Sequence, residues 1–244
     1  MQVCSERRTG VSKNYRKPIL LPNGEYSGIL VGDYVIIREG RQSAELYEHG
    51  FFGNFLEERH YDVVQPACFT SADQEEDDIQ QKMKLWRSIQ LRNNNLHLSM
   101  EESMYLSHEL SILKIFLKSR SISSHELWNY YFSRYGTRFI KRYVVYRYYR
   151  NKDWIVHSGL LYACDFIIYH DGPGYNHSTA ALYIANPTNC HDIKLFSNFN
   201  RFLSNVKKIF IKIDVDIPSD LILNTPDCLK KICIKQVISS SLDV

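Results

Sequence analysis

Hydrophobic and polar positions divide the chain into four stretches of different character. Residues 1–23 are basic and polar without apolar periodicity, so we expect a flexible N-terminus. Residues 24–87 begin with the strand-like run YSGILVGDYVIIREG and the short helical run RQSAELYEHGFFGN, which glycines close. The acidic run TSADQEEDDIQQKM then follows, and its charge is typical of a surface segment or linker.

Residues 88–154 carry the strongest helical signals. Ser99 and Glu102 form a capping box, and the leucines that follow recur at helical spacing, namely Leu106, Leu110, Leu113 and Leu117. A second capping box, Ser123 with Glu126, opens another helix, and TRFIKRYVVYRYYRNK predicts a third. We therefore expect a small helical N-terminal region, with one amphipathic helix running through the leucine series.

Residues 155–244 are richer in β-strand signals. DWIVHSGLLYACDFIIY and STAALYIAN are typical of strands, DIKLFSNFNRFLSNV of a helix and KKIFIKIDV of a further strand, in which Lys208, Phe210 and Lys212 face away from the isoleucines. A strand, a helix and a strand in succession predict a βαβ crossover, and KKICIKQVIS supplies a last strand. The expected fold class is α/β, with a C-terminal mixed-sheet domain flanked by helices.

Composition narrows the function only slightly. The 244 residues carry a formal net charge of +3, which permits an anionic partner without requiring one. The six cysteines form no CxxC pair and no zinc-ligand spacing, so we expect free thiols, no metal and no cofactor. The N-terminus lacks the apolar core of a signal peptide, and no run of about 18 apolar residues predicts a membrane span.

Three residues that can move protons or hold a phosphate are expected at neighbouring strand ends. Tyr169 ends one strand in DFIIYHDGPGYNHSTAALYI, His177 opens the next and Lys208 begins a third. Ligand sites of α/β sheets gather at such strand ends. The set suits metal-free RNA cleavage, in which a base activates the ribose 2′-OH, an acid protonates the 5′ oxygen and a cation stabilises the charged phosphorus.

Ordinary pKa values suggest roles within this group. Histidine titrates near neutrality and suits the acid, whereas lysine is a point charge for phosphate oxygens. Tyrosine has a pKa of about 10 and needs a cation such as Lys208 to favour its phenolate. Composition leaves an alternative open, in which Tyr169 packs by its ring, His177 is a loop histidine and Lys208 is a solvated charge. His170 points to the other side of the strand from Tyr169 and is left out of the group.

The same residues resemble the catalytic domain of the tRNA-splicing endonuclease family, also called tRNA-intron lyases. That family shows a tyrosine after an apolar strand, a Gly-Pro loop and a histidine before a small residue, which here are Tyr169, DGPGYN and His177 with Ser178. Its lysine lies in a basic dipeptide before an apolar strand, where SNVKKIFI places Lys208. IIREGRQSAELYEHGFFGN, LHLSMEESMYLSHEL and TPDCLKKICIKQVIS further resemble the eukaryotic catalytic subunit of the Sen-two type, which cuts the 5′ splice site.

The resemblance implies a restriction-endonuclease-like domain in residues 155–244 and a role for each candidate. Tyr169 is the base on the 2′-OH, His177 the acid toward the 5′ oxygen, and Lys208 the group that stabilises the transition state. The implied products are a 2′,3′-cyclic phosphate and a 5′-OH, formed without a metal or other cofactor. The implied partners are precursor tRNA, a second catalytic subunit and two structural subunits, in a nuclear heterotetramer with no membrane.

Three arginines are candidates for RNA contacts. The resemblance implies that Arg201 helps to clamp a flipped intron base by cation–π stacking, although Leu242 stands where the family has a partner aromatic. Arg147 and Arg150 lie among tyrosines in KRYVVYRYYR and suit contacts to phosphates. That run equally fits a helix with an aromatic core face and snorkelling cations. For the whole chain, the alternative is a non-catalytic structural or RNA-binding subunit of the same kind of complex.

Overall fold

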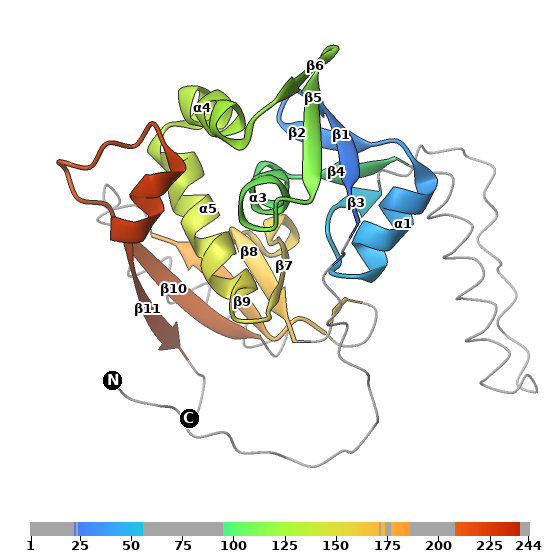
Figure 1. Cartoon of the computed structure of the whole chain (residues 1–244). Helices are drawn as coiled ribbons and strands as arrows, with labels where there is room; N and C mark the ends of the chain where they lie inside the picture. Colours follow the sequence, from blue (N-terminus) through green and yellow to red (C-terminus); the bar gives the residue numbers. More distant parts are fainter. Residues whose placement is uncertain are drawn as a thin grey trace, which may run out of the picture.

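Two β-sheets and the helices packed against them make up the part of the protein that the structure describes. The structure, a computed structural model, describes residues 22, 24–55, 95–170, 172–173, 177–185 and 208–239. Figure 1 shows α3 (Met100–Met104) and α5 (Thr137–Arg150) between the two sheets, with α4 (Ser124–Tyr135) beside them. This layering confirms the expected mixed α/β class. Among the helices of the described residues, none has the length and apolar run needed to cross a membrane.

The N-terminal sheet combines strands from two distant parts of the chain. Its order is β3-β4-β2-β1-β5-β6, and β1 and β5 run parallel, with Gly28 opposite Ile115. Strands β1, β2 and β3 lie before residue 56 in the chain, and β4, β5 and β6 lie after residue 95. The expected division between residues 24–87 and 88–154 therefore separates strands of one sheet. The strands are β1 (Tyr26–Val31), β2 (Tyr34–Ile37), β3 (Asn54–Phe55), β4 (Leu96–Leu98), β5 (Leu113–Leu117) and β6 (Arg120–Ile122).

The helix predicted through the leucine series is wrong beyond residue 109. α3 continues as a turn of π-helix, η1 (Tyr105–Glu109), and Ser111 then takes a left-handed φ of 55°. In β5, Leu113 and Ile115 are buried whereas Lys114 between them is exposed. Side chains of a strand alternate between its two faces. The residues after Ser111 follow this period of two and form a strand, although the leucines alone fit a helix.

The other helices predicted within the described residues are confirmed, together with both capping boxes. The side chains of Ser99 and Ser123 accept hydrogen bonds at 3.2 Å from the backbone N–H of Glu102 and Glu126. Each carboxylate in turn accepts from the backbone N–H of its serine at 2.8 Å. The short helix predicted near residue 45 is α1 (Gly40–Glu48). Local side-chain chemistry therefore sets the starts of α3 and α4.

The C-terminal sheet has the order β11-β10-β9-β8-β7. β9 and β10 run parallel, with Ala180 opposite Ile209, and the other neighbours are antiparallel. The parallel pair agrees with the predicted crossover, whereas the helix expected at residues 192–206 lies outside the described residues. The elements are β7 (Ile155–Ser158), η2 (Leu160–Tyr162), β8 (Phe166–Tyr169), β9 (Ala180–Ile184), β10 (Ile209–Asp216), η3 (Pro226–Lys231) and β11 (Cys233–Ser239).

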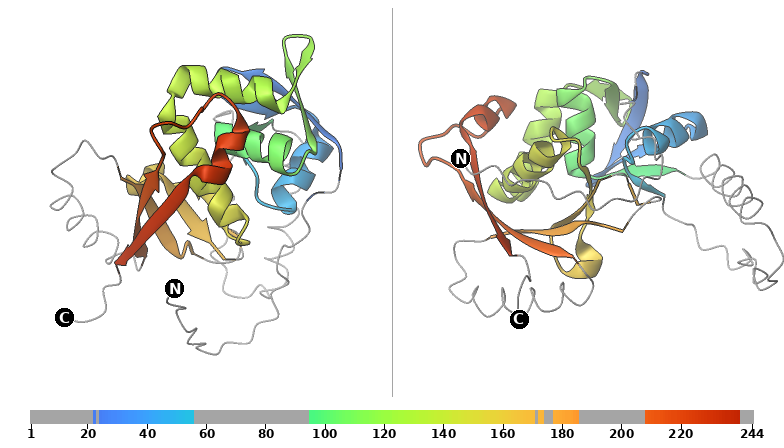
Figure 2. Two further views of the ribbon diagram at one scale, coloured as in Figure 1. Left: turned by 60° about the vertical axis from the view of Figure 1, so that its left-hand side comes forward. Right: turned by 90° about the horizontal axis from the view of Figure 1, so that it is seen from below.

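The two faces of this sheet bury different clusters. The face toward α5 joins the main core, which is continuous with the N-terminal sheet. The opposite face carries a smaller group that we call the second cluster, formed by Cys164, Ile167, Ala181 and Phe210, with Tyr162, Tyr169 and Tyr183 packed against it. Phe210, which the sequence turns away from the isoleucines of β10, is therefore buried on this second face. Figure 2 shows the turn that contains η2 on this second face, on the side of the sheet away from α5.

Candidate active site

Three backbone segments meet at one edge of the C-terminal sheet. Tyr169 ends β8 and Lys208 immediately precedes β10. Thr179 lies between them, because its N–H donates to the carbonyl of Ile168 at 2.8 Å and its carbonyl accepts from the N–H of Ile209 at 3.2 Å. The strand registers thus place Tyr169, Thr179 and Lys208 in one row. Since neighbouring strands lie about 4.8 Å apart, the backbones of Tyr169 and Lys208 are separated by about 10 Å.

Two groups of the protein hold the ammonium group of Lys208. Its Nζ donates to the carbonyl oxygen of Ser178 at 3.3 Å and lies 4.8 Å from the centroid of the Tyr162 ring. Tyr162 is the last residue of η2 and packs against the second cluster. An ammonium group has three N–H donors, so these contacts leave donor capacity for a phosphate oxygen.

Tyr169 is half-buried, and its surroundings act on the phenol in opposite directions. Burial raises the pKa of Tyr169 above its usual range, and the neighbouring Tyr162 raises that pKa further. A side-chain hydrogen bond with Ser178 opposes both effects by lowering the pKa. The net result is a raised pKa, which corrects the expectation that Lys208 makes Tyr169 more acidic. The phenol is therefore protonated at neutral pH.

His177 is exposed and immediately precedes Ser178 in the chain. Ser178 contacts Lys208 through its carbonyl and Tyr169 through its side chain. The backbone consequently brings His177 within one residue of a group that touches both of the other candidates. The structure thus gathers all three predicted residues at one sheet edge.

Two other histidines lie near this edge in different settings. The ring of His170 meets Trp154 edge-on, with centroids 5.8 Å apart, and Trp154 packs against the main core. The ring of His157 meets Tyr169 edge-on, with centroids 5.9 Å apart. Burial lowers the pKa of His157 to about 4, and the charge of Arg150 lowers it too. His157 is therefore neutral at physiological pH and supports the Tyr169 ring as an aromatic neighbour.

Sequence reasoning missed the roles of Tyr162 and Ser178. Ser178 entered the motif only as a small residue after His177, although its buried position leaves both its carbonyl and its side chain in contact with candidates. Tyr162 lies in SGLLYAC, which is typical of a strand by composition but forms the tight turn η2. An alternating pattern carries no information about which side chain of such a turn points inward.

Arg150, predicted to contact RNA, is only 9% exposed. Its guanidinium donates to the carbonyl of Gly50 at 2.8 Å and to the hydroxyl of Tyr146 at 2.9 Å, and lies 4.1 Å from the centroid of the Phe52 ring. The buried cation therefore ties α5 to the loop after α1. A buried arginine engaged in this way is not available to a phosphate, so the prediction for Arg150 is corrected to a structural role.

Of the other two arginines predicted to contact RNA, only Arg147 lies within the described residues. Arg147 lies on α5 with its Nε donating to Glu109 at 2.7 Å, and its side chain is about one-third exposed. α5 covers the face of the sheet opposite to Tyr169, so Arg147 does not join the candidate active site. Arg201 and Leu242 lie outside the described residues.

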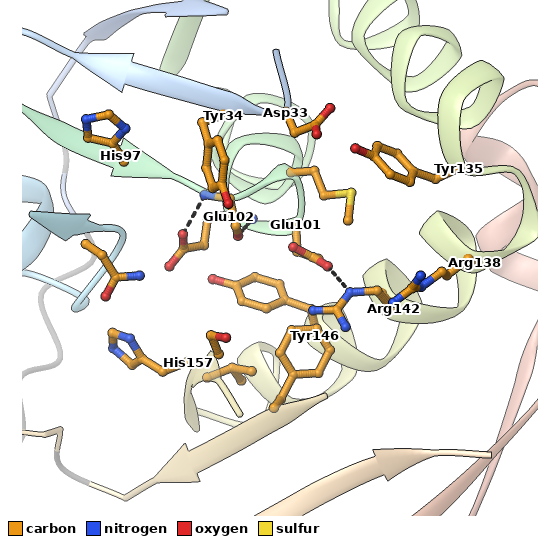
Figure 3. A pocket seen from close by; sticks show the side chains of 16 residues that line it. Asp33, Tyr34, His97, Glu101, Glu102, Tyr135, Arg138, Arg142, Tyr146 and His157 are labelled. Atoms are coloured by element: carbon orange, nitrogen blue, oxygen red, sulfur yellow. Dashed lines mark hydrogen bonds and ion pairs between the residues drawn. The ribbon is translucent and has the colours of Figure 1, made fainter. Parts of the chain in front are cut away.

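A cavity of about 490 Å³ lies between the N-terminal sheet and α5. Figure 3 shows Glu101 and Arg142 joined by an ion pair in its lining, and Arg142 also reaches Asp165, at 2.8 Å. The positive charge of Arg142 is thus paired with two carboxylates of the protein, those of Glu101 and Asp165. The lining includes His157 but none of Tyr169, His177 or Lys208. The cavity is therefore a neighbour of the candidate active site rather than part of it.

These features define a two-sheet α/β protein with a tyrosine, a histidine and a lysine gathered at one edge of its C-terminal sheet. The family model described as tRNA intron endonuclease, catalytic C-terminal domain, matches residues 139–221. The model of the N-terminal domain of the same family matches residues 26–128. Both domains are matched in chain order, and the chain belongs to the tRNA intron endonuclease family.

Several curated proteins are similar to the chain. It is 30% identical over 149 residues to the probable tRNA-splicing endonuclease subunit Sen2 of Oryza sativa subsp. japonica, which covers 57% of the chain and 50% of the rice protein. It is 28% identical over 156 residues to the tRNA-splicing endonuclease subunit Sen2 of Mus musculus, covering 59% and 34%. It is also 29% identical over 150 residues to the tRNA-splicing endonuclease of Saccharolobus islandicus, covering 62% and 68%. The match thus spans half of the rice protein and about a third of the mouse protein, and the family and subunit type expected from the sequence are confirmed.

Proposed function

We propose that this chain is a catalytic subunit of a tRNA-splicing endonuclease that cleaves precursor tRNA at the 5′ exon–intron junction. The observation that carries the proposal is the arrangement around Ser178. Its side chain contacts Tyr169, its carbonyl holds Lys208, and His177 immediately precedes it. The names of the rice and mouse relatives, which are Sen2 subunits of tRNA-splicing endonuclease, support the same assignment.

The proposed reaction is a transesterification that needs no metal ion. Tyr169 in its phenolate form takes the proton of the ribose 2′-OH, and the 2′ oxygen attacks the adjacent phosphorus. The bond from phosphorus to the 5′ oxygen breaks, and His177 gives that oxygen its proton. Lys208 stabilises the charge that develops on the phosphate oxygens. The products are a 2′,3′-cyclic phosphate and a 5′-OH, and one proton has moved onto Tyr169 while one has left His177.

The raised pKa of Tyr169 means that this mechanism needs groups that favour the phenolate form. Only a small fraction of a phenol is ionised well below its pKa, so the base is in its active form in only a small fraction of the molecules at neutral pH. The Ser178 hydrogen bond and a Lys208 donor turned toward the phosphate both favour negative charge at the site. The proposed site therefore combines a weakly acidic base with fixed groups that assist its ionisation.

A second candidate function is a non-catalytic RNA-binding subunit of the same kind of complex. The half-buried, protonated Tyr169 favours it, because a phenol with a raised pKa donates a hydrogen bond more readily than it accepts a proton. In that case Lys208 contributes affinity alone. Removing Lys208 then weakens RNA binding and leaves the rate of the bound complex unchanged.

The deciding experiment uses His177→Ala in the complex assembled with a second catalytic subunit and two structural subunits. Single-turnover cleavage of an intron-containing precursor tRNA is followed at each junction, with EDTA present. We expect cleavage at the 5′ junction to fall by about 100-fold or more while the 3′ junction is still cut, and mass spectrometry of the wild-type 5′ exon to show a cyclic phosphate. Wild-type cleavage of the 5′ junction by His177→Ala excludes the catalytic assignment.

The control for this experiment is His170→Ala, which removes a nearby imidazole that packs on Trp154 rather than in the group. We expect that variant to cleave both junctions at the wild-type rate.

We also propose that the chain works with these partner subunits in the nucleus. Purification of the tagged chain from cells, with imaging of the tag, tests both, and a lone chain or a purely cytoplasmic signal contradicts this part.

A further inference from the structure

Tyr162 lies close to two of the three candidate residues on the second face of the sheet. Its ring lies under the Lys208 ammonium at 4.8 Å from Nζ to the ring centroid. It is also close enough to Tyr169 to raise the pKa of that phenol by charge repulsion. Both Tyr162 and Tyr169 pack against the second cluster. Tyr162 takes no part in the proton transfers of the proposed reaction.

The turn that carries Tyr162 is anchored from within. The N–H of Tyr162 donates to the carbonyl of Gly159 at 2.9 Å, and the thiol of Cys164 donates to the same carbonyl at 3.4 Å. Leu160 and Leu161 of the same turn are 81% and 92% exposed, whereas Tyr162 is half-buried. Tyr162 is thus the inward-pointing residue of η2, and its ring has a defined position.

Lys208 has a physical need for such a support. A lysine side chain has a flexible four-carbon stem, and ordering it costs rotamer entropy. The single hydrogen bond to Ser178 fixes one direction of the ammonium group. Attraction between the cation and the face of a tyrosine ring offsets part of that entropy. Ring and carbonyl together hold the ammonium group before RNA binds.

We propose that Tyr162 is a positioning residue of the active site, whose ring holds the Lys208 ammonium beside Ser178 and toward the phosphate at which Tyr169 acts. The inference rests on the proposed function. Because the ring acts through Lys208, its loss affects the chemical step more than RNA binding. It also predicts that the aromatic ring is needed while the hydroxyl group is not.

The first test compares Tyr162→Phe with Tyr162→Leu in the assembled complex. Single-turnover rates are measured on precursor tRNA, and dissociation constants on a precursor with a 2′-deoxy nucleotide at the 5′ junction. We expect Tyr162→Leu to cleave about tenfold more slowly with binding within about twofold of wild type, and Tyr162→Phe to stay within about twofold in both. Equal losses in the two variants, or a wild-type rate for Tyr162→Leu, overturn the proposal.

A second readout tests the cation–π contact itself, which a role in packing alone does not use. A series with increasingly fluorinated phenylalanine at position 162 keeps the shape of the ring and weakens its attraction for a cation. The rate is expected to fall with each fluorine, and a flat series overturns the proposal even if Tyr162→Leu fails to fold.

Tyr183→Leu is the matched packing control. Tyr183 packs against the same second cluster, and it lies opposite Lys212, four residues along β10 from Lys208. We expect Tyr183→Leu to keep the wild-type rate, and a loss as large as that of Tyr162→Leu overturns the proposal.

Lys208→Ala distinguishes a failure of the proposed function from a failure of the positioning role of Tyr162. If Lys208→Ala stops cleavage while Tyr162→Leu does not slow it, the proposed function stands and the positioning role fails. If Lys208→Ala cleaves normally, the proposed function itself fails.

Discussion

Tyr169 and Ser178 are joined by a side-chain hydrogen bond across the ends of two neighbouring strands. The bond lowers the pKa of the Tyr169 phenol, against the larger effect of burial. Ser178 also accepts a hydrogen bond from Lys208 through its carbonyl. One buried serine therefore connects the proposed base to the proposed phosphate-binding cation.

Ser178→Ala is expected to slow cleavage at neutral pH by raising the pKa of Tyr169. A hydrogen bond contributes about 1 kcal/mol, which corresponds to about a fivefold smaller ionised fraction below the pKa. Because the reaction needs the ionised base and the protonated acid together, the maximal rate is then expected to fall by about the same factor. Single-turnover cleavage across pH 6 to 10 measures this, with exposed Ser133→Ala as the control. A wild-type maximal rate contradicts this account of the bond.

His157 predicts a pH dependence of stability. Its pKa is lowered to about 4 in the folded protein, below the unfolded value of about 6.5, so the unfolded chain binds a proton that the folded chain does not. The free energy of unfolding is therefore expected to fall as pH drops from 6.5 to 4, by up to about 3 kcal/mol. Urea denaturation at several pH values measures the slope. His157→Phe is expected to flatten it, whereas exposed His170→Phe leaves it as in wild type.

Arg150 and Arg147 lie one turn apart on α5 and form a matched pair. Arg150→Met leaves the carbonyl of Gly50 and the hydroxyl of Tyr146 without their donor, so we expect a loss of about 3 kcal/mol in the free energy of unfolding. Arg147→Met removes a partly exposed ion pair with Glu109 and is expected to lose about 1 kcal/mol or less. Thermal and chemical denaturation give both values.

RNA binding by the same two variants checks the assignment of Arg150 as structural. At a temperature where both are folded, Arg150→Met is expected to bind precursor tRNA with wild-type affinity and an unchanged salt dependence. A phosphate contact by Arg150 instead predicts weaker binding and a shallower salt slope. That result contradicts the structural role.

Gly172 lies in the loop between Tyr169 and His177 and has a φ of 114°. A Cβ at this position meets Cε2 of Phe51 at 2.5 Å, so Gly172→Ala combines backbone strain with a steric clash. We expect it to destabilise the protein by about 2 kcal/mol and to slow cleavage, because the loop that carries His177 has to shift. Gly32→Ala is the control, since Gly32 has a φ of 59° with nothing within 4 Å of a Cβ.

The clash and the strain in Gly172→Ala are separable by a second substitution. Phe51→Ala removes the ring atoms that the new methyl group meets. Measured against Phe51→Ala alone, the Gly172→Ala change is expected to lose only as much stability as Gly32→Ala does. An additive loss in the double variant contradicts a direct clash.

Local chemistry explains which elements could be predicted. The capping boxes of α3 and α4 depend on residues three apart in the chain, so both starts were predictable. The strand β5 was not predictable, because the leucines before and after Ser111 continue one helical spacing. Only the left-handed backbone at Ser111 ends the helix there. The burial of Phe210 was not predictable, because a single strand does not show that its sheet is covered on both sides.

The sequence by itself determined the identity of the candidates and their order. Tyr169, His177 and Lys208 stand at strand ends around a Gly-Pro loop, and that information is local. Only the tertiary structure decided what surrounds them. Desolvation, ring contacts and register depend on groups that packing brings from elsewhere, such as the Tyr162 ring under Lys208. For the same reason burial rather than a neighbouring cation sets the pKa of Tyr169, since the free energy of a charge depends on everything that displaces water around it.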